Sequence, residues 1–264
     1  HQKPSQETVN HGVDANISSN SKLVSSAASD YKESGPFYMS EKMIRLVDHA
    51  RALEPEIGIL TGKEQHLFPL DTDQEYKLFG SVLQSIPKSS YDAIVLMPAG
   101  RMGGADLVAA LLARALSQNA SVLILRTDAS DWDFQHWYAD NVDSVDISKT
   151  FKEIRNKERA LYLLLSKLRA SKIFNVNSRL AFDTFMSYGK QLSRQSAVYA
   201  YYFCADRTPE GYETGYPVWY FHPLLQHLDA ALFDTHYLAN VLAERYAIPH
   251  IALDKLKPLY TPAQ

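Results

Sequence analysis

Short apolar runs alternate with amphipathic segments through most of the chain. Positions 93–97 and 121–125 are apolar at nearly every residue, which is typical of strands buried on both faces in a parallel sheet. Between them, residues 105–117 repeat apolar side chains at helical spacing. The pattern therefore predicts a strand, a helix and a second strand, joined by a right-handed crossover.

The same alternation continues to the C-terminus. It predicts further strands at 144–147, 172–176, 197–203, 230–233 and 250–253, and helices at 151–168, 180–192, 219–228 and 236–246. Strands that alternate with helices indicate an α/β fold. We expect a Rossmann-like, mainly parallel sheet with helices on both faces.

The first part of the chain has no such alternation. Residues 1–36 contain eight Ser and three Asn, and this composition buries too little apolar surface to offset the entropy of ordering. They are predicted to be a disordered linker or tail. Residues 37–90 are predicted to be a helical lead-in, with helices near 40–53 and 74–85, and residues 91–264 to be the Rossmann-like domain.

Composition excludes some classes of protein. The 264 residues are 46% hydrophobic and 22% charged, with a net charge of −3, so the chain lacks the basic excess typical of nucleic-acid binding. The sequence has no run of about 18 apolar residues, so it predicts no transmembrane helix. The single cysteine, Cys204, follows an apolar run and is expected to be buried and inert. Because the chain starts at His1, we expect it to be a piece of a longer protein.

Candidate chemistry follows the predicted strands. Ligands of open parallel sheets bind beyond the carboxyl ends of the strands. The candidate residues found there are Gly103, Gly104, Ala105, Asp106, Asn177, Ser178, Asp206, Asp234 and His236. Glycines just before a helix let a ligand approach backbone N–H groups, and the helix dipole favours an anion. The spacing matches neither G-x-G-x-x-G nor a P-loop, and a tight turn explains these glycines as well.

Two other features allow two interpretations each. Five of the eleven residues at 211–221 are aromatic, so Tyr212 and Tyr216 fit either a platform that stacks on sugar rings or a packed lid. The triplets at 71–73 and 131–133 each carry two Asp, which suits either a metal-bound diphosphate or helix N-caps. The histidine spacing matches no metal motif, so no metal site is predicted.

Several short motifs occur in an order that resembles one family. Over residues 91–262, the chain is similar to the N-terminal domain of bacterial family-4 glycosyltransferases of the GT-B fold, in particular the surface-polysaccharide type. The motifs that carry the resemblance are Val95-Leu96-Met97-Pro98, Gly103-Gly104-Ala105-Asp106, the segment 175–178, Phe203-Cys204-Ala205-Asp206, Gly211, Gly215-Tyr216 and Asp234-Thr235.

The resemblance implies transfer of a sugar from a nucleotide-diphosphate sugar to a glycan or lipid-linked glycan acceptor in polysaccharide biosynthesis. The donor would bind a C-terminal domain that this sequence lacks, so the fragment alone is expected to be inactive and to hold no cofactor tightly. Residues 103–106 would face the donor diphosphate, and Asp206 would orient or activate the acceptor. Acceptor contacts would come from Asn177, Ser178, Tyr212, Tyr216, Asp234 and His236.

The sequence departs from the family at two of these positions. Better-known members carry a His after the fifth strand, where Asp206 stands here, and many carry one after the fourth strand, where Asn177 and Ser178 stand. The resemblance also implies a cytoplasmic location, at the inner face of the membrane for a lipid-linked acceptor, with peripheral membrane association through the full-length protein.

Two other functions stay open. One is a non-catalytic module that binds a glycan or a partner protein. The other is a different nucleotide-dependent α/β enzyme, such as a dehydrogenase or epimerase, against which the missing G-x-G-x-x-G counts.

Overall fold

A computed structural model describes residues 45, 49–50, 52–53, 70 and 73–260. The chain divides into two units, residues 1–67 and 68–264. The described positions of the first unit are all helical, as expected for the helix near 40–53, whereas the predicted linker 1–36 lies outside the described residues. The domain boundaries at 36/37 and 90/91 stay predictions.

The second unit is built on a seven-stranded sheet in which neighbouring strands run parallel. The strand order is β3-β2-β1-β4-β5-β8-β9. The bounds are β1 Ala93–Met97, β2 Val122–Arg126, β3 Asp143–Asp146, β4 Lys172–Val176, β5 Ala197–Tyr202, β8 Ala230–Phe233 and β9 Leu256–Pro258. The chain order reverses between β1 and β4, so the predicted Rossmann-like α/β class is confirmed.

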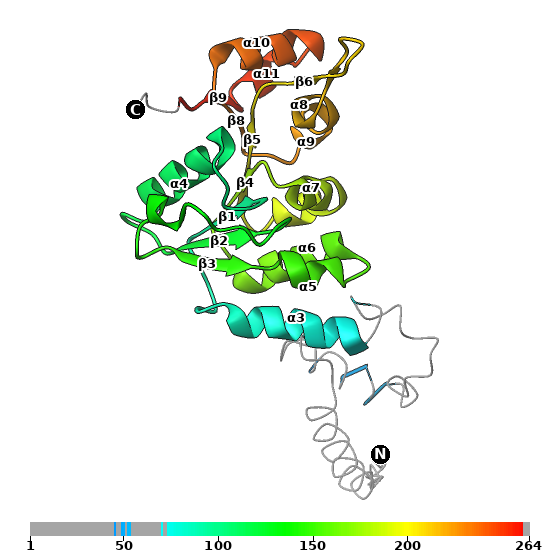
Figure 1. The fold of residues 1–264 in the computed structure, drawn as a ribbon. Coiled ribbons are helices and arrows are strands. Elements are labelled where there is room, and N and C mark those ends of the chain that lie inside the picture. Colours follow the sequence, from blue (N-terminus) through cyan, green and yellow to red (C-terminus); the bar gives the residue numbers. More distant parts are fainter. Residues whose placement is uncertain (1–44, 46–48, 51, 54–69, 71–72, 261–264) are drawn as a thin grey trace, which may run out of the picture. The chain divides into compact units, whose positions relative to one another are not determined.

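Helices cover both faces of this sheet. In Figure 1, α4 lies against one face of the sheet, and α6 and α7 lie on the other side. The bounds are α3 Asp73–Ser85, α4 Gly104–Leu116, η2 Gln135–Trp137, α5 Ser148–Lys152, α6 Lys157–Leu168, α7 Arg179–Leu192, α8 Tyr216–Trp219, α9 Phe221–Leu224, α10 His236–Arg245 and α11 His250–Leu253. A separate antiparallel hairpin pairs β6 Asp206–Arg207 with β7 Glu213–Thr214.

The core explains why the central strands are apolar at every position. Side chains alternate between the two faces of a strand, and Val95 and Met97 of β1 pack with Val108 of α4 in one buried cluster. Ile94 and Leu96 are also fully buried and face the other way. Each buried aliphatic side chain contributes about 1.5–3 kcal/mol of transfer free energy, so both faces of β1 hold the fold together.

The predicted strand at 250–253 is wrong. These residues form helix α11 instead, and the last strand is β9, whose Leu256 pairs with Ala231 of β8. Ile251 is 90% exposed, so it takes no part in the core. Three apolar residues do not distinguish a strand from a helix, and Pro249 at the N-cap favours a helix start.

Two predicted helices are each split in two. The helix expected at 151–168 is interrupted because the Asn156 side chain accepts a hydrogen bond from the Arg159 N–H (3.0 Å) and thereby caps a new helix, α6. The helix expected at 219–228 begins earlier, at Tyr216, and is divided at Tyr220 into α8 and α9. Gly215, whose φ is 93°, sets the start of α8.

Cys204 is also corrected by the structure. Strand β5 ends at Tyr202, so Cys204 lies in the loop that follows and is exposed, not buried as predicted. None of the helices in the described part of the chain combines the length and the apolarity needed to cross a membrane.

Candidate functional site

Hydrogen bonds join the loops that follow β1 and β2, beside the point between β1 and β4 where the strand order reverses. The N–H of Thr127 donates to the carbonyl of Met97 (2.9 Å), and the N–H of Asp128 donates to the carbonyl of Pro98 (2.9 Å). In parallel α/β sheets, ligands bind at this switch point, beyond the carboxyl ends of the strands. The side chains along this edge of the sheet are therefore the candidates for a site.

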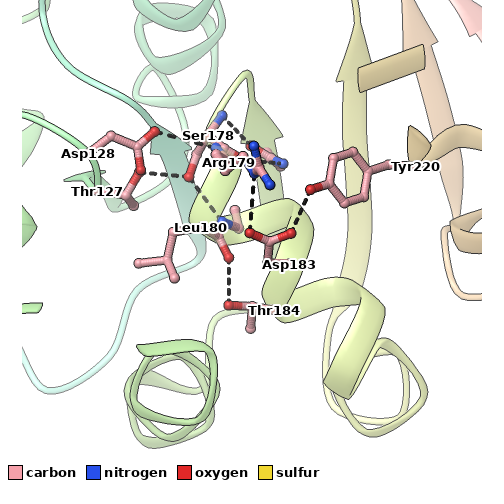
Figure 2. A network of polar contacts seen from close by, with 10 residues as sticks. Thr127, Asp128, Ser178, Arg179, Leu180, Asp183, Thr184 and Tyr220 are labelled. Atoms are coloured by element: carbon pink, nitrogen blue, oxygen red, sulfur yellow. Dashed lines mark hydrogen bonds and ion pairs between the residues drawn. The ribbon is translucent and has the colours of Figure 1, made fainter. Parts of the chain in front are cut away.

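A buried polar contact joins the ends of β1, β2 and β4 (Figure 2). The hydroxyls of Thr127 and Ser178 lie 2.6 Å apart, and the Thr127 hydroxyl is 3.0 Å from the Met97 carbonyl. Ser178 also accepts from the Ala181 N–H (3.0 Å) and caps α7, while its own N–H donates to Asn175 (2.9 Å). Ser178 is fully buried, so it supports the edge from below.

Asn177 occupies the exposed side of the same turn. Its φ of 66° is left-handed, a conformation that Asn tolerates better than most residues. Its side chain is half-buried. Strained backbone of this kind is common at binding sites, and Asn177 follows β4, next to the switch point.

A group of charged and aromatic residues surrounds the start of α7. We name it the α7 cluster, and its members are Asp128, Arg179, Asp183, Tyr216, Trp219 and Tyr220. Figure 2 shows the Asp183 carboxylate between the Arg179 guanidinium and the Tyr220 hydroxyl. The Arg179 Nε is 3.4 Å from Asp183 Oδ2, and the Tyr220 hydroxyl donates to Asp183 Oδ1 at 2.5 Å. Burial raises the pKa of Tyr220 to about 12, and Asp183 adds to this shift.

The other contacts of the cluster come from β2 and α8. Asp128 Oδ2 accepts from the Arg179 N–H at 3.4 Å, and Asp128 Oδ1 lies 3.1 Å from the Thr127 hydroxyl. Burial raises the pKa of Asp128 despite these hydrogen bonds. The Arg179 guanidinium also lies 5.7 Å from the centre of the Trp219 ring, within the range of a cation–π contact. The cluster thus combines two carboxylates and a guanidinium with an aromatic surface.

Asp206 lies beside this cluster. Burial raises the pKa of Tyr216, and the charges of Asp128, Asp183 and Asp206 raise it further. A Cβ on Gly215 would come within 2.8 Å of Asp206 Oδ2, so Gly215 makes room for this carboxylate. The structure therefore brings together Asp206 and Tyr216, two of the predicted site residues, through the β6–β7 hairpin, which the sequence pattern did not indicate.

The glycine turn and Asp106 lie on the α4 side of the switch point. Gly103 is the N-cap of α4, and a Cβ on Gly104 would meet nothing within 4 Å among the described residues. Ala105 and Asp106 in the first turn are half-buried. Burial raises the pKa of Asp106 to about 6, although Arg101 acts in the opposite direction. The start of α4 thus leaves open space at Gly104 and carries, at Asp106, a carboxyl group whose pKa is raised.

Three predicted site residues lie apart from the cluster. Tyr212 is 73% exposed on the hairpin, and nothing in the described part of the chain connects it with the α7 cluster. Asp234 and His236 follow β8, which is separated from β4 by β5. The His236 ring contacts Tyr260, with 5.6 Å between the ring centres.

Arg179 and Asp183 are not among the site residues predicted from the sequence. The available signal was an Arg and an Asp four residues apart in the first turns of a helix that follows a strand. Of the two Asp triplets, the one at 71–73 has its first two residues outside the described residues. Asp131 pairs with Arg101 at 2.9 Å and caps no helix, and the described residues bring together no three His, Cys, Asp or Glu side chains suited to a metal.

A pocket of about 240 Å³ lies next to the cluster, beyond the ends of β2 and β3 and beside the starts of α6 and α7. It is lined by Thr127, Asp128, Ser148, Phe151, Lys152, Lys157, Glu158, Arg179, Leu180 and Asp183. Three members of the α7 cluster, Asp128, Arg179 and Asp183, therefore form one side of this pocket.

Comparison with known proteins gives a fold likeness only. The sequence matches no protein-family model and no curated protein. Among solved structures, an α-glucosyltransferase in complex with UDP and a 13-mer DNA containing an HMU base aligns with a TM-score of 0.38 and 9% identity, over 66% of this chain. The match spans 43% of the glucosyltransferase chain. A likeness this distant carries no information about substrate or mechanism.

Proposed function

We propose that this chain is the acceptor-binding half of a GT-B glycosyltransferase, which transfers a sugar from a nucleotide-diphosphate sugar to a hydroxyl of a glycan or lipid-linked glycan. The α7 cluster is the observation that carries the proposal. Sugars present hydroxyl groups, which hydrogen-bond to carboxylates and guanidinium groups, and C–H faces, which pack on aromatic rings. The cluster offers both kinds of contact at the switch point of the sheet.

The geometry leaves bonding capacity for a ligand. An ionised carboxylate has about four lone-pair sites, so Asp183 can accept a substrate hydroxyl in addition to its bonds from Arg179 and Tyr220. Trp219 is 47% exposed and presents ring surface to a sugar. Asn177 adds an amide that both donates and accepts.

The proposed reaction assigns a role to each side of the switch point. Asp206 takes the proton from the acceptor hydroxyl as a general base. The hydroxyl oxygen then forms the bond to the anomeric carbon of the donor, and the nucleoside diphosphate departs with the electron pair of the broken bond. Open N–H groups at the start of α4, after Gly103 and Gly104, stabilise the charge on that diphosphate. In this proposal, the donor sugar nucleotide binds a second, C-terminal domain.

A titration of the 264-residue chain tests the binding half of this proposal. We expect short bacterial oligosaccharides to bind in calorimetry or ligand-observed NMR, and UDP and GDP alone not to bind. Arg179→Gln and Trp219→Ala should each weaken oligosaccharide binding about tenfold, because each removes one polar or stacking contact. Arg194→Gln, an exposed site beyond the end of α7, is the matched control and should leave binding unchanged.

The outcomes separate the alternatives. Tight nucleotide binding without oligosaccharide binding would contradict the proposal. Oligosaccharide binding alone also fits a non-catalytic glycan-binding module. The deciding measurement is therefore transfer by the full-length protein supplied with UDP- and GDP-sugars: the Asp206→Asn variant should lose transfer by a large factor and keep the acceptor affinity.

A further inference from the structure

The pocket beside the α7 cluster is rich in charge. Lys152, Lys157, Glu158 and Ser148 are among the residues that line it. At about 240 Å³, the pocket is smaller than the roughly 300–1,000 Å³ typical of sites that enclose a whole drug-sized ligand. Its size suits one charged group of a larger ligand.

The carboxylates of the pocket are largely compensated within the protein. Asp183 contacts Arg179 and the Tyr220 hydroxyl. Asp128 accepts from the Arg179 N–H at the start of α7, where the helix dipole favours a negative charge. Glu158 lies in the first turn of α6 and gains from that helix dipole in the same way.

The lysines are not compensated to the same degree. Within the described residues, neither Lys152 nor Lys157 lies within ion-pair distance of a carboxylate. Lys152 attracts Asp131 only weakly, since Arg101 is the main partner of that carboxylate. Two ammonium groups therefore remain available to an anion.

Ser148 provides an independent indication of a ligand. The residue is 1% exposed, and its Oγ has no hydrogen-bond partner among the described residues. Its N–H donates to Asp146 at 2.9 Å, so the backbone is satisfied and only the hydroxyl is not. A buried hydroxyl without a partner is costly and uncommon, whereas a bound oxyanion would accept its proton.

We propose that this pocket binds a phosphate group, a monoester or a diphosphate, that is carried by the sugar acceptor. The inference rests on the proposed function and specifies its substrate: the sugar packs on the α7 cluster, and its phosphate lies between Ser148, Lys152 and Lys157. Lysines bind phosphate as flexible point charges, and the Ser148 hydroxyl donates a charge-assisted hydrogen bond to it.

The test is a calorimetric titration of the 264-residue chain with a hexose 1-phosphate, the same hexose, inorganic phosphate and UDP. The hexose phosphate should bind at least tenfold more tightly than the hexose. Ser148→Ala and Lys157→Gln should each remove about a tenfold gain in affinity and leave hexose binding unchanged. Glu158→Gln should tighten hexose phosphate binding severalfold, because it removes a like charge.

Two variants serve as matched controls. Ser166→Ala removes another buried hydroxyl that has no partner in the described part of the chain, from a residue outside the pocket. Lys190→Gln removes an exposed lysine from the last turn of α7. Both should leave every affinity unchanged. If Ser148→Ala impairs folding, Lys157→Gln still decides the question, because Lys157 is only half-buried and supports no core contact.

Each outcome has a distinct meaning. Equal affinity for hexose and hexose phosphate overturns this inference and leaves the proposed function standing. Phosphate binding with no contribution from the sugar supports the pocket and contradicts the proposed function. Lys157-dependent binding of UDP that is tighter than that of hexose phosphate overturns the assignment to the acceptor. Binding of neither sugar nor phosphate overturns both proposals.

Discussion

The two edges of the parallel sheet use polar side chains in opposite ways. At the amino edge, polar groups close on one another between strands. Asp92 accepts from both the N–H and the hydroxyl of Ser121 (2.8 and 2.7 Å), and Asp229 accepts from the Val198 N–H (2.8 Å). These hydrogen bonds lower the pKa of Asp92. The amino edge is therefore a set of satisfied links between strand starts.

At the carboxyl edge, polar groups keep bonding capacity. The Nε of Arg126, the Oγ of Ser148 and the hydroxyl of Tyr202 lie at or just beyond strand ends, and none has a hydrogen-bond partner in the part of the chain that the structure describes. Burial raises the pKa of Asp106 and of Asp128 there, the reverse of Asp92. One fold thus has a closed edge that stabilises it and an open edge suited to a ligand.

The largest expected loss of stability comes from Gly100, and Gly104 at the start of α4 is its comparison. A Cβ on Gly100 would lie 2.3 Å from Trp132 Cε3, so Gly100→Val should lower the free energy of unfolding by about 3 kcal/mol through overpacking. Gly104→Ala meets nothing within 4 Å and should cause no loss. Urea denaturation measures both.

The Gly104→Ala variant also tests the role of the carboxyl edge in transfer. Under the proposed mechanism, Gly104→Ala should reduce transfer by the full-length protein, since its methyl group fills the open space at the start of α4. Unchanged transfer would remove the glycine turn from the proposed mechanism, and equal destabilisation by both substitutions would contradict the packing that distinguishes them.

Parts of this fold were predictable from the sequence because a local pattern encodes them. Strand β1 is buried at every position, so an unbroken apolar run marked it, and β8 was recognised in the same way. The alternation of strands and helices predicted the α/β class, but the strand order, and with it the switch point between β1 and β4, came only from the structure. Helix α11 was predicted as a strand, because its three apolar residues fit either structure, and strand β9, Leu-Lys-Pro, was missed because it has no apolar run.

The candidate site was predictable only in part. Its loops were found because they follow apolar strands, but its contacts join residues distant in sequence. Asp183 and Tyr220 are 37 positions apart, and Thr127 and Ser178 are 51 apart. No local pattern specifies which side chains meet over such separations. Ser178, expected to contact a ligand, is buried beneath the site against Thr127.

The contribution of Asp106 to the free energy of unfolding should depend on pH. Folding raises its carboxyl pKa from 3.8 to about 6, so ionisation costs more in the folded state, and its contribution to stability falls as pH rises through that window. Asp106→Asn should therefore raise the free energy of unfolding at pH 7 by about 1–2 kcal/mol. The gain should vanish below about pH 3, where the carboxyl is protonated in both states.

Asp92→Asn should behave oppositely. The pKa of Asp92 is lowered in the fold, so its charge stabilises the protein at neutral pH, and that contribution disappears in acid. The variant should be less stable than the parent at pH 7 and match it at low pH. Urea titrations at several pH values measure both variants, and shifts of the same sign would contradict the contrast between the two edges.

A smaller loss is expected at the amino edge. The Tyr91 hydroxyl donates to Asp143 at 2.9 Å, and Lys88 pairs with the same carboxylate at 2.8 Å. Tyr91→Phe should lower the free energy of unfolding by about 1 kcal/mol, the typical net contribution of one hydrogen bond. It should leave ligand binding unchanged. Weaker oligosaccharide binding in this variant would mean that the amino edge is not purely structural.

The smallest expected effect distinguishes two adjacent tyrosines of β5. Tyr202 is fully buried among Phe182, Phe221 and Phe233, and its hydroxyl has no hydrogen-bond partner in the described residues. Tyr202→Phe removes a desolvated hydroxyl but leaves a small void, so we expect a net gain of about 0.5 kcal/mol. Tyr201, by contrast, donates to the Leu259 carbonyl at 2.6 Å, and Tyr201→Phe should lose about 1 kcal/mol. Denaturation midpoints of the two variants, measured side by side, should move in opposite directions. A clear loss from Tyr202→Phe would show that its hydroxyl is satisfied after all, and would remove it from the open polar groups of the carboxyl edge.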